Sequence, residues 1–337
     1  MRLFYNATST NFGDHINSWL WPRLIPELLA REDDEVLVGV GSLLKSDLDR
    51  VPGEKHIFGT GSGYGPPPPP ETARGWNVHC VRGPLTARHY GLEPQAAVTD
   101  GAWLIGQLPE WQGTFDTGGE VLFIPHWTSA AYGNWAPVCA MAGLTYVDPL
   151  DDGPSILRRI AAARLVVTES LHGAIFADYF RTPWAPVASA NRVLHFKWVD
   201  WCMSIGVPYE TRALPPSDLV DALIQRVRPS REMPSPDPRA YTADDFPYAP
   251  AAAVSDAGAA YRLKTRAKGV ARGVRGRVLD GLRARRDGLG MGAWNRGYRE
   301  EVAGYLGTLA GCDGMLSEDA VWDRLVGELG ERLKGMI

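Results

Sequence analysis

The sequence predicts an α/β fold built from two consecutive halves, each a parallel sheet covered by helices. Three observations predict it. Short apolar runs recur along the first two-thirds of the chain, most of them end at a glycine-bearing turn, and a helix-compatible stretch follows each run. This alternation is typical of βαβ units, which place parallel strands in one sheet. The chain has 337 residues, enough for about two domains, and 45% hydrophobic with 22% charged residues is an ordinary globular composition.

The first half of the pattern covers residues 1–116. Its predicted strands are Arg2–Tyr5, Glu35–Val40, Lys55–Phe58, Asn77–Val81 and Ala96–Thr99. Pro84 suits the first turn of a helix over Leu85–Tyr90. Asp14 precedes a predicted helix over Ile16–Trp21, where it is either an N-cap or an acid that contacts a ligand.

The second half covers residues 117–228, after a polar, glycine-rich stretch at 113–119. Its predicted strands are Glu120–Ile124, Thr145–Val147, Arg164–Thr168 and Trp184–Val187, and its predicted helices are Ala130–Ala142, Ser155–Ala163 and His172–Phe180. Two Rossmann-like domains that face each other across a cleft are the architecture we expect. Open α/β sheets bind ligands at the carboxyl ends of their strands, so we expect the polar residues after each strand to form the site.

Residues 229–337 differ in composition, with a proline-rich linker followed by a basic tail. Ten Lys and Arg residues and a single acid lie between Arg262 and Arg286, and apolar residues recur there at spacings of three and four. This predicts an amphipathic helix with a cationic face. It contacts an anionic membrane surface, packs as a solvated helix on the body of the protein, or is disordered. One or two small helices are expected over Asp313–Lys334.

Charge and composition exclude several classes of protein. A net charge of −4 argues against a nucleic-acid binder. The chain contains no run of about 18 apolar residues, and its first residues do not resemble a signal peptide. Its four cysteines are far apart, which fits a reducing compartment and argues against a structural zinc site. We therefore expect a cytoplasmic protein with no metal.

The most informative segment is 166–175, where an apolar run ends in Thr168 and a turn leads into a helix near His172. A helix N-terminus offers free N–H groups to a phosphate or carboxylate, and Gly173 lets a ligand approach the backbone. A histidine there can donate a proton to a bound anion. The alternative is a polar turn in which His172 acts only as a cap. Glu169, beside it, either tunes the histidine or faces solvent.

Six segments together resemble a known family. They are Asn11-Phe12-Gly13-Asp14, Gly39-Val40-Gly41-Ser42, Gly59-Thr60-Gly61-Ser62-Gly63, Val81-Arg82-Gly83-Pro84-Leu85-Thr86, Asp100-Gly101-Ala102 and Leu171-His172-Gly173-Ala174. In this order and at these intervals the chain resembles the polysaccharide pyruvyl transferases, above all the ketal-forming enzymes of exopolysaccharide assembly such as the succinoglycan type. The resemblance covers roughly residues 1–205.

The resemblance implies a GT-B-like fold and transfer of a pyruvyl group from phosphoenolpyruvate to a sugar of a cell-surface polysaccharide intermediate, forming a ketal. It implies no cofactor beyond this co-substrate, and a lipid-linked oligosaccharide acceptor at the inner face of the cell membrane. His172 matches the general acid, and Asp14 is the candidate acid at the acceptor hydroxyl. The candidate binding residues are Arg82, Asn11, Gly13, Gly61, Ser62, Asp100, His126, Ser170, Leu171, Gly173, Arg192 and Lys197.

One position departs from the family pattern. Many members carry arginine before the Leu-His pair, whereas this chain has Ser170. Arg192 or Lys197 would then supply the missing charge, unless both are surface residues. The departure keeps open one alternative, a non-catalytic component of polysaccharide assembly. A second alternative is a GT-B glycosyltransferase that uses a nucleotide sugar, because the same two-domain cleft would suit it, with the helix at His172 holding a diphosphate. The twelve tryptophans suit either core packing or apolar platforms for sugars.

Overall fold

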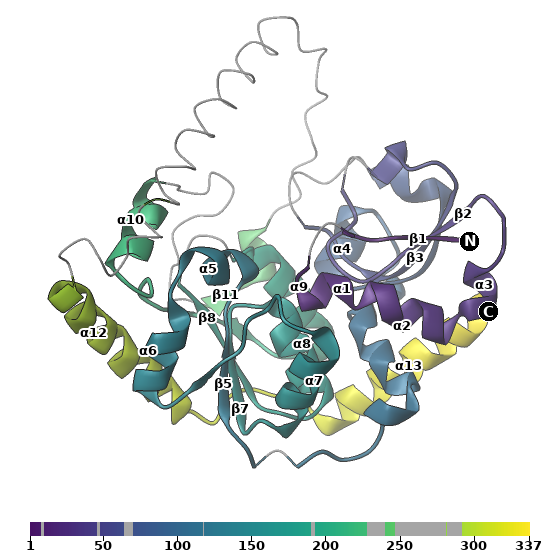
Figure 1. Cartoon of the computed structure of the whole chain (residues 1–337). Helices are drawn as coiled ribbons and strands as arrows, with labels where there is room; N and C mark the ends of the chain where they lie inside the picture. The colour runs from purple at the N-terminus through teal and green to yellow at the C-terminus, as the bar shows by residue number, and fades with distance from the viewer. Residues whose placement is uncertain are drawn as a thin grey trace, which may run out of the picture.

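Two parallel sheets form the centre of the fold (Figure 1). The computed structural model describes residues 1–7, 10–45, 48–63, 70–116, 118–189, 193–227, 240–246, 281 and 292–337. Within them the chain is a mixed α/β structure, with one sheet from each half of the sequence pattern. The predicted α/β class with parallel sheets is confirmed.

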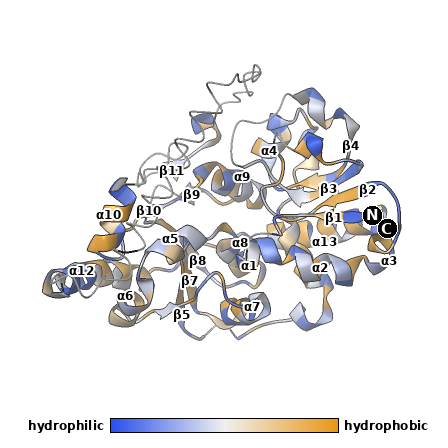
Figure 2. Cartoon of the chain, turned by 45° about the horizontal axis from the view of Figure 1, so that its top comes forward, coloured by the Kyte–Doolittle hydropathy of each residue, from blue (hydrophilic) through white to orange (hydrophobic). Residues whose placement is uncertain are grey.

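The first sheet consists of β1 (Arg2–Phe4), β2 (Glu35–Val38), β3 (Glu54–Thr60) and β4 (Trp76–Val81), paired in that order and all parallel. Its central strands carry apolar side chains on both faces, as expected of a parallel sheet covered on both sides. In β3, Ile57 and Phe58 point into two different apolar clusters. Figure 2 shows these strands largely in the hydrophobic colours.

The second sheet has the order β10–β8–β7–β5–β6, again all parallel. Its strands are β5 (Val121–Ile124), β6 (Thr145–Tyr146), β7 (Leu165–Thr168), β8 (Trp184–Ala188) and β10 (Arg212–Ala213). Each residue of β7 is buried, and Val166 and Val167 belong to different clusters on opposite faces of the sheet. Two short strands, β9 (Tyr209–Glu210) and β11 (Ala240–Tyr241), form a separate antiparallel two-stranded sheet.

Helices cover both faces of the second sheet. The pair α7 (Gly153–Ala162) and α8 (Leu171–Tyr179) contributes to the cluster on one face, and α6 (Trp135–Ala142) and α12 (Gly292–Ala310) contribute to the cluster on the other. Other helices among the described residues are α1 (Phe12–His15), α2 (Asn17–Leu24), α3 (Pro26–Leu29), α4 (Pro84–His89), α5 (Trp127–Tyr132), α9 (His195–Ile205) and α10 (Leu219–Val227).

The last helix, α13 (Asp319–Met336), returns from the second half to the first. It contacts β4, α9 and the 3₁₀ helix η4 (Gly101–Gln107), and Figure 1 shows it running beneath the first sheet toward the N-terminus. Leu325, Leu329 and Leu333, at spacings of four, are buried in the largest apolar cluster. This cluster also contains Leu37 of the first sheet and Val166 of the second, so both halves share one core.

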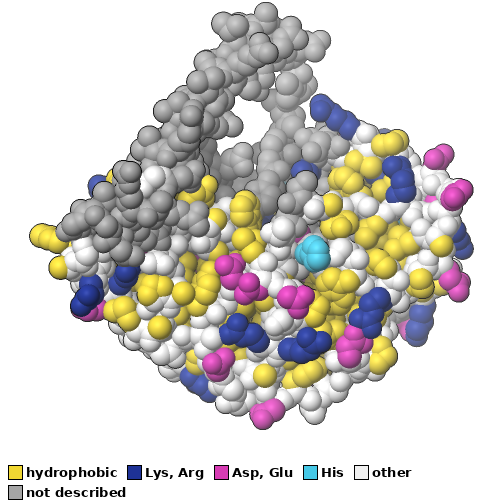
Figure 3. Space-filling model, in the orientation of Figure 1, with side chains coloured by type: hydrophobic (Ala, Val, Ile, Leu, Met, Phe, Trp, Pro, Cys, Tyr) yellow, Lys and Arg dark blue, Asp and Glu magenta, His cyan; other side chains and the backbone are white. Residues whose placement is uncertain are grey.

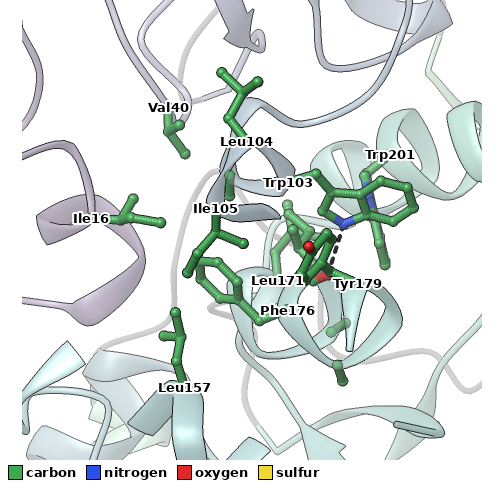
Figure 4. Close-up of a cluster of buried hydrophobic side chains, with 14 of the residues drawn as sticks. Ile16, Val40, Trp103, Leu104, Ile105, Leu157, Leu171, Phe176, Tyr179 and Trp201 are labelled. Carbon is green, nitrogen blue, oxygen red and sulfur yellow. Dashed lines mark hydrogen bonds between the residues drawn. The ribbon is translucent and has the colours of Figure 1, made fainter. Parts of the chain in front are cut away.

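The core extends under the helix that carries the most informative motif. Figure 4 shows Leu171, Phe176 and Tyr179 of α8 packed beside Trp103 and Ile105 of η4. The Trp103 Nε1 group donates a hydrogen bond of 2.9 Å to the carbonyl oxygen of Ile175, drawn as a dashed line. The start of α8 is thereby fixed relative to the first half of the chain.

Some local predictions are wrong, and the reasons are physical. The run Ala96–Thr99 is not a strand, because Pro94 begins a 3₁₀ turn and only one bridge, Val81 to Ala97, forms. The helix expected over Ala130–Ala142 is two helices, α5 and α6. They are divided near Gly133, where an added Cβ would lie 2.7 Å from the Ser129 carbonyl oxygen.

Two other corrections concern helix ends. Asp14 does not cap a helix at Ile16, because α1 already includes it and Asn11 occupies the N-cap position. Within the range Asp313–Lys334, where one or two small helices were expected, there is one long helix, α13, which starts at Asp319 and extends to Met336, while α12 lies before this range and was not predicted. Arg192 and the predicted basic helix over 262–286, apart from position 281, lie outside the described residues.

The described surface mixes charges of both signs. Figure 3 shows Lys, Arg, Asp and Glu side chains interspersed on the face in view, with hydrophobic side chains between them. This mixture agrees with the small net charge.

Among the described helices, none is long and apolar enough to cross a membrane.

Candidate functional site

A pocket of about 320 Å³ lies where residues from both halves of the chain meet. Its walls come from the loops after β1, β2, β4, β5 and β7, together with α1 and α9, so it lies at the carboxyl ends of both sheets. The lining residues are Phe4, Tyr5, Asn6, Asn11, Asp14, Gly41, Ser42, Leu43, Lys45, Arg82, Asp100, His126, Trp127, Ser170, Leu171, His172 and Lys197.

Most of the residues selected from the sequence lie in this pocket. They are Asn11, Asp14, Arg82, Asp100, His126, Ser170, Leu171, His172 and Lys197. Gly13, Gly61, Ser62 and Gly173 do not line it but lie directly behind it. An added Cβ on Gly13 would lie 2.6 Å from His172 Cβ, and one on Gly61 would lie 2.7 Å from Arg82 Nε. These glycines allow the two side chains to pack where they do.

His172 lies in the first turn of α8. The strand β7 ends at Thr168, whose hydroxyl accepts a hydrogen bond of 2.9 Å from the Ser170 backbone N–H. Ser170 is the N-cap, and its side chain accepts from the Gly173 N–H at 3.3 Å. Ser170 therefore satisfies one of the N–H groups that a helix start leaves unpaired. A side chain at Gly173 would place its Cβ 2.7 Å from the Thr168 hydroxyl, so glycine fits this turn.

His172 faces a buried carboxyl group from the other half of the chain. Its Nε2 lies 3.9 Å from Asp100 Oδ1. Asp100 caps η4, since Oδ1 accepts from the Ala102 N–H at 2.9 Å. Its Oδ2 and the His172 Nε2 are buried and make no hydrogen bond with any described residue. The hydrogen-bonding capacity of both atoms is therefore not met by the described residues.

Burial changes the pKa of both groups. Loss of solvent raises the pKa of Asp100 to about 7, although the charge of Arg82 opposes the rise. Burial lowers the pKa of His172 to about 3, and the charges of Lys197 and Arg82 lower it further. In the empty pocket the imidazole is therefore neutral at physiological pH. A bound anion would offset the two cations and raise the pKa of His172.

Arg82 follows β4 and is buried. Its Nε donates to Asp200 Oδ2 at 3.0 Å, and its Nη2 donates to the Ser62 carbonyl oxygen at 2.7 Å. Its Nη1 donates to the Ser42 hydroxyl at 3.1 Å. The guanidinium thus reaches the pocket wall while most of its donors bind protein. Its positive charge affects the pocket, although the guanidinium itself is held in a buried ion pair with Asp200.

Asp200 was not predicted from the sequence. It lies on α9, and its Oδ1 accepts from the Thr86 N–H at 2.9 Å while its Oδ2 accepts from the Thr86 hydroxyl at 2.6 Å. Asp200 therefore satisfies the start of α4, whose own N-cap residue Gly83 has no side chain to do so. A glycine at the N-cap position of α4 is a signal in the sequence that the first N–H groups of this helix need a hydrogen-bond acceptor from another segment.

Two lysines line the pocket. Lys197 lies in the first turn of α9, and its charge lowers the pKa of both His172 and Asp100. Lys45, in the loop after β2, was not selected from the sequence, because nothing in its surroundings there marks it. Together with Arg82 they give the pocket three cationic side chains.

An aromatic side chain lies at the edge of the pocket. His126 caps α5, where its Nδ1 is 2.7 Å from the Thr128 hydroxyl, and Trp127 follows it with 44% of its surface exposed.

Glu169 does not contact His172 through a hydrogen bond. It accepts from the Ser189 N–H and hydroxyl, both at 2.6 Å, and from the His126 N–H at 3.1 Å. Glu169 holds the loops after β5, β7 and β8 together.

Asp14 and Asn11 also line the pocket, on either side of Gly13, which packs against His172. Asp14 Oδ2 accepts a hydrogen bond of 3.4 Å from Asn6 Nδ2, and its backbone carbonyl accepts from Asn17 Nδ2 at 2.9 Å. The carboxylate thus faces the pocket rather than a helix start.

No group of three or more His, Cys, Asp and Glu side chains suited to a metal ion occurs among the described residues.

Comparison with known proteins gives one informative relative. The chain is 38% identical over 225 residues to the succinoglycan biosynthesis protein ExoV of Rhizobium meliloti (strain 1021), and the match covers 67% of this chain and 71% of that protein. No family model matches the chain.

Proposed function

The chain belongs to the exopolysaccharide-biosynthesis family of the succinoglycan biosynthesis protein ExoV, and from this premise we propose that it transfers a pyruvyl group from phosphoenolpyruvate to a sugar of a cell-surface polysaccharide intermediate. The observation that carries the proposal is a buried histidine, His172, at a helix start in a pocket with three cationic side chains. A donor with a phosphate and a carboxylate needs such cations, and its enol carbon needs an acid.

Lys197 is the residue we assign to the donor in place of the arginine that many family members carry before the Leu-His pair. Ser170 occupies that position here and caps α8 instead. Lys197, on α9, lines the same pocket as Ser170 and His172. Lys45 and the N-terminal end of α8 complete the proposed anion site, while Arg82 contributes charge from behind.

His172 is the proposed acid. It protonates the methylene carbon of the enol phosphate, which leaves positive charge on the neighbouring carbon. One sugar hydroxyl attacks that carbon, phosphate leaves, and a second hydroxyl closes the ketal ring. One of the two hydroxyl protons replaces the proton that His172 gave up, and the other leaves with the phosphate. Asp14 also lines the pocket, and we assign its carboxylate the role of accepting a proton from the attacking hydroxyl.

The acceptor we propose is an oligosaccharide on a lipid carrier. Trp127 supports a sugar acceptor, because an exposed indole at a pocket edge offers an apolar platform to the face of a sugar ring. The basic segment 262–286 would hold the enzyme at an anionic membrane surface, where each Lys or Arg contributes about 1 kcal/mol. Two parallel sheets with a pocket at their carboxyl ends also support a GT-B-like arrangement.

The test is a calorimetric titration with phosphoenolpyruvate and, in parallel, with UDP-glucose. We expect the wild-type protein to bind phosphoenolpyruvate and not the nucleotide sugar, and we expect Lys197→Ala to weaken binding at least tenfold, which corresponds to about 1.4 kcal/mol. Lys334→Ala is the matched control, because its ammonium is exposed on α13 and pairs with Glu331 at 2.7 Å. Binding of UDP-glucose instead would make the protein a glycosyltransferase and refute the proposal.

A further inference from the structure

Asp100 and His172 are two buried titratable side chains that face each other across the pocket. They come from opposite halves of the chain, and the Nε2 to Oδ1 distance is 3.9 Å. Catalytic hydrogen bonds are often this long before substrate binds and shorten in the complex. We propose that this pair holds one proton in common, and that Asp100 supplies the proton which His172 passes to the donor.

The two oxygens of Asp100 differ in their contacts, so a role in proton transfer is compatible with its role as a helix cap. Asp100 caps η4 with Oδ1 alone, through the Ala102 N–H. Its second oxygen, Oδ2, is buried and has no hydrogen-bond partner among the described residues, and the same holds for His172 Nε2. Buried polar atoms are nearly always paired, so two unpaired atoms in one pocket indicate a function beyond capping.

The surrounding charges decide where the proton resides. Arg82 and Lys197 lower the pKa of Asp100, the carboxylate of Asp200 raises it, and burial is the largest effect and brings it to about 7. His172 has its pKa lowered to about 3 by burial, Lys197 and Arg82. In the empty pocket the proton therefore resides on Asp100, and His172 is neutral. Lys45 and Asp14, also in the lining, face the same space.

Binding of the donor stabilises a proton on the pair. Phosphoenolpyruvate brings negative charge next to both groups, so it favours the protonated form of each. The proton moves from the Asp100 carboxyl to His172 Nε2, which leaves a carboxylate beside an imidazolium. His172 then forms a C–H bond to the methylene carbon, and its nitrogen becomes neutral again. The proton of the first hydroxyl, taken by Asp14, leaves with the phosphate, and the proton of the second hydroxyl restores the Asp100 carboxyl, so the step balances without another reactant.

This inference rests on the proposed function, since it needs an anionic donor in the pocket. It makes a prediction about binding alone, which requires no acceptor. At pH about 8 the phosphate of the donor is already a dianion, because the second pKa of a phosphate monoester is about 6. Asp100 of the empty protein is then mostly ionised. Binding that raises its pKa must therefore take up close to one proton from the buffer.

The experiment measures this uptake by calorimetric titration of phosphoenolpyruvate in buffers with different enthalpies of ionisation. We expect nearly one proton per bound donor for the wild-type protein and little uptake for Asp100→Asn, which keeps an oxygen for the Ala102 cap. Asp178→Asn is the matched control. Asp178 is also buried with a raised pKa, but it binds Ser317 and Trp184 away from the pocket. We expect this control to take up protons as the wild type does.

The outcomes separate the two claims. If Asp100→Asn binds the donor with the same proton uptake as the wild type, the shared proton is refuted while the donor site stands. If the wild-type protein binds no phosphoenolpyruvate at all, both the proposed function and this inference are refuted. If Asp100→Asn does not fold, Asp100→Ser replaces it, because serine is also a good cap. Wild-type affinity supplies a second readout, since uptake of one proton requires affinity to fall by about tenfold per pH unit above pH 7.

Discussion

Gly13 controls the position of the proposed acid, and its replacement by alanine should move that acid. An added Cβ would lie 2.6 Å from His172 Cβ and closer still to the ring, whereas ordinary contact begins at 3.4 Å. The histidine must therefore retreat by at least about 0.8 Å, and overpacking of this kind costs about 1–3 kcal/mol of stability. A displacement near 1 Å at a reacting group lowers turnover by about a hundredfold.

The assay for Gly13→Ala is phosphate release from phosphoenolpyruvate in the presence of acceptor, with thermal unfolding measured on the same preparation. Gly153→Ala is the matched control. Gly153 packs against α1 as well, but its added Cβ would meet Phe12 and Trp19 at 3.8 Å, an ordinary contact. Equal turnover in the two variants would refute the placement of His172 against Gly13.

Three further predictions concern stability, the acceptor and the thiols. Asp200→Ala should lower the free energy of unfolding by about 3–5 kcal/mol in urea titrations, because it leaves the buried Arg82 guanidinium uncompensated; a loss below about 1 kcal/mol would contradict this. Trp127→Ala should raise the acceptor KM about fivefold for a lost stacking contact of about 1 kcal/mol, while Trp294→Ala, 81% exposed on α12, should not. A thiol reagent should label Cys312 first, since the other three thiols are buried with raised pKa values, and fast labelling of all four would be inconsistent with the core.

Sequence patterns predicted the parts of the site that depend on local order. Thr168, Ser170 and His172 are neighbours along the chain, so the passage from a buried strand through a polar turn to a helix was readable directly. The position of Asp100 after an apolar run was readable in the same way. Strand ends of parallel sheets meet at one edge, which explains why these residues reach a common pocket.

Contacts between distant segments were not predictable from the same patterns. Arg82 and Asp200 are 118 positions apart, and Asp200 lies in a helix whose other residues are mostly buried and apolar. Nothing local distinguishes such an acid from a solvent-exposed one. The return of α13 to the first sheet depends likewise on packing of Leu325, Leu329 and Leu333 and not on any local signal.

A test of the basic segment 262–286 must leave the helices that follow it intact. Removing everything after residue 255 would delete α13, whose leucines belong to the shared core, and α12, whose leucines belong to the cluster on one face of the second sheet. Replacing the Lys and Arg residues of 262–286 by Gln removes the charge and leaves both helices in place. Loss of binding to anionic vesicles in that variant, with unchanged thermal unfolding, is the result expected of a membrane contact.

The central claim is pyruvyl transfer, and mass spectrometry of the acceptor tests it most directly. Lipid-linked oligosaccharides extracted from exopolysaccharide-producing cells would be incubated with phosphoenolpyruvate and the protein. We predict one pyruvate ketal on a sugar for each phosphate released, and neither product with His172→Gln. Wild-type protein that leaves both phosphoenolpyruvate and the oligosaccharides unchanged, or that extends them by a sugar from a nucleotide donor, would contradict the account.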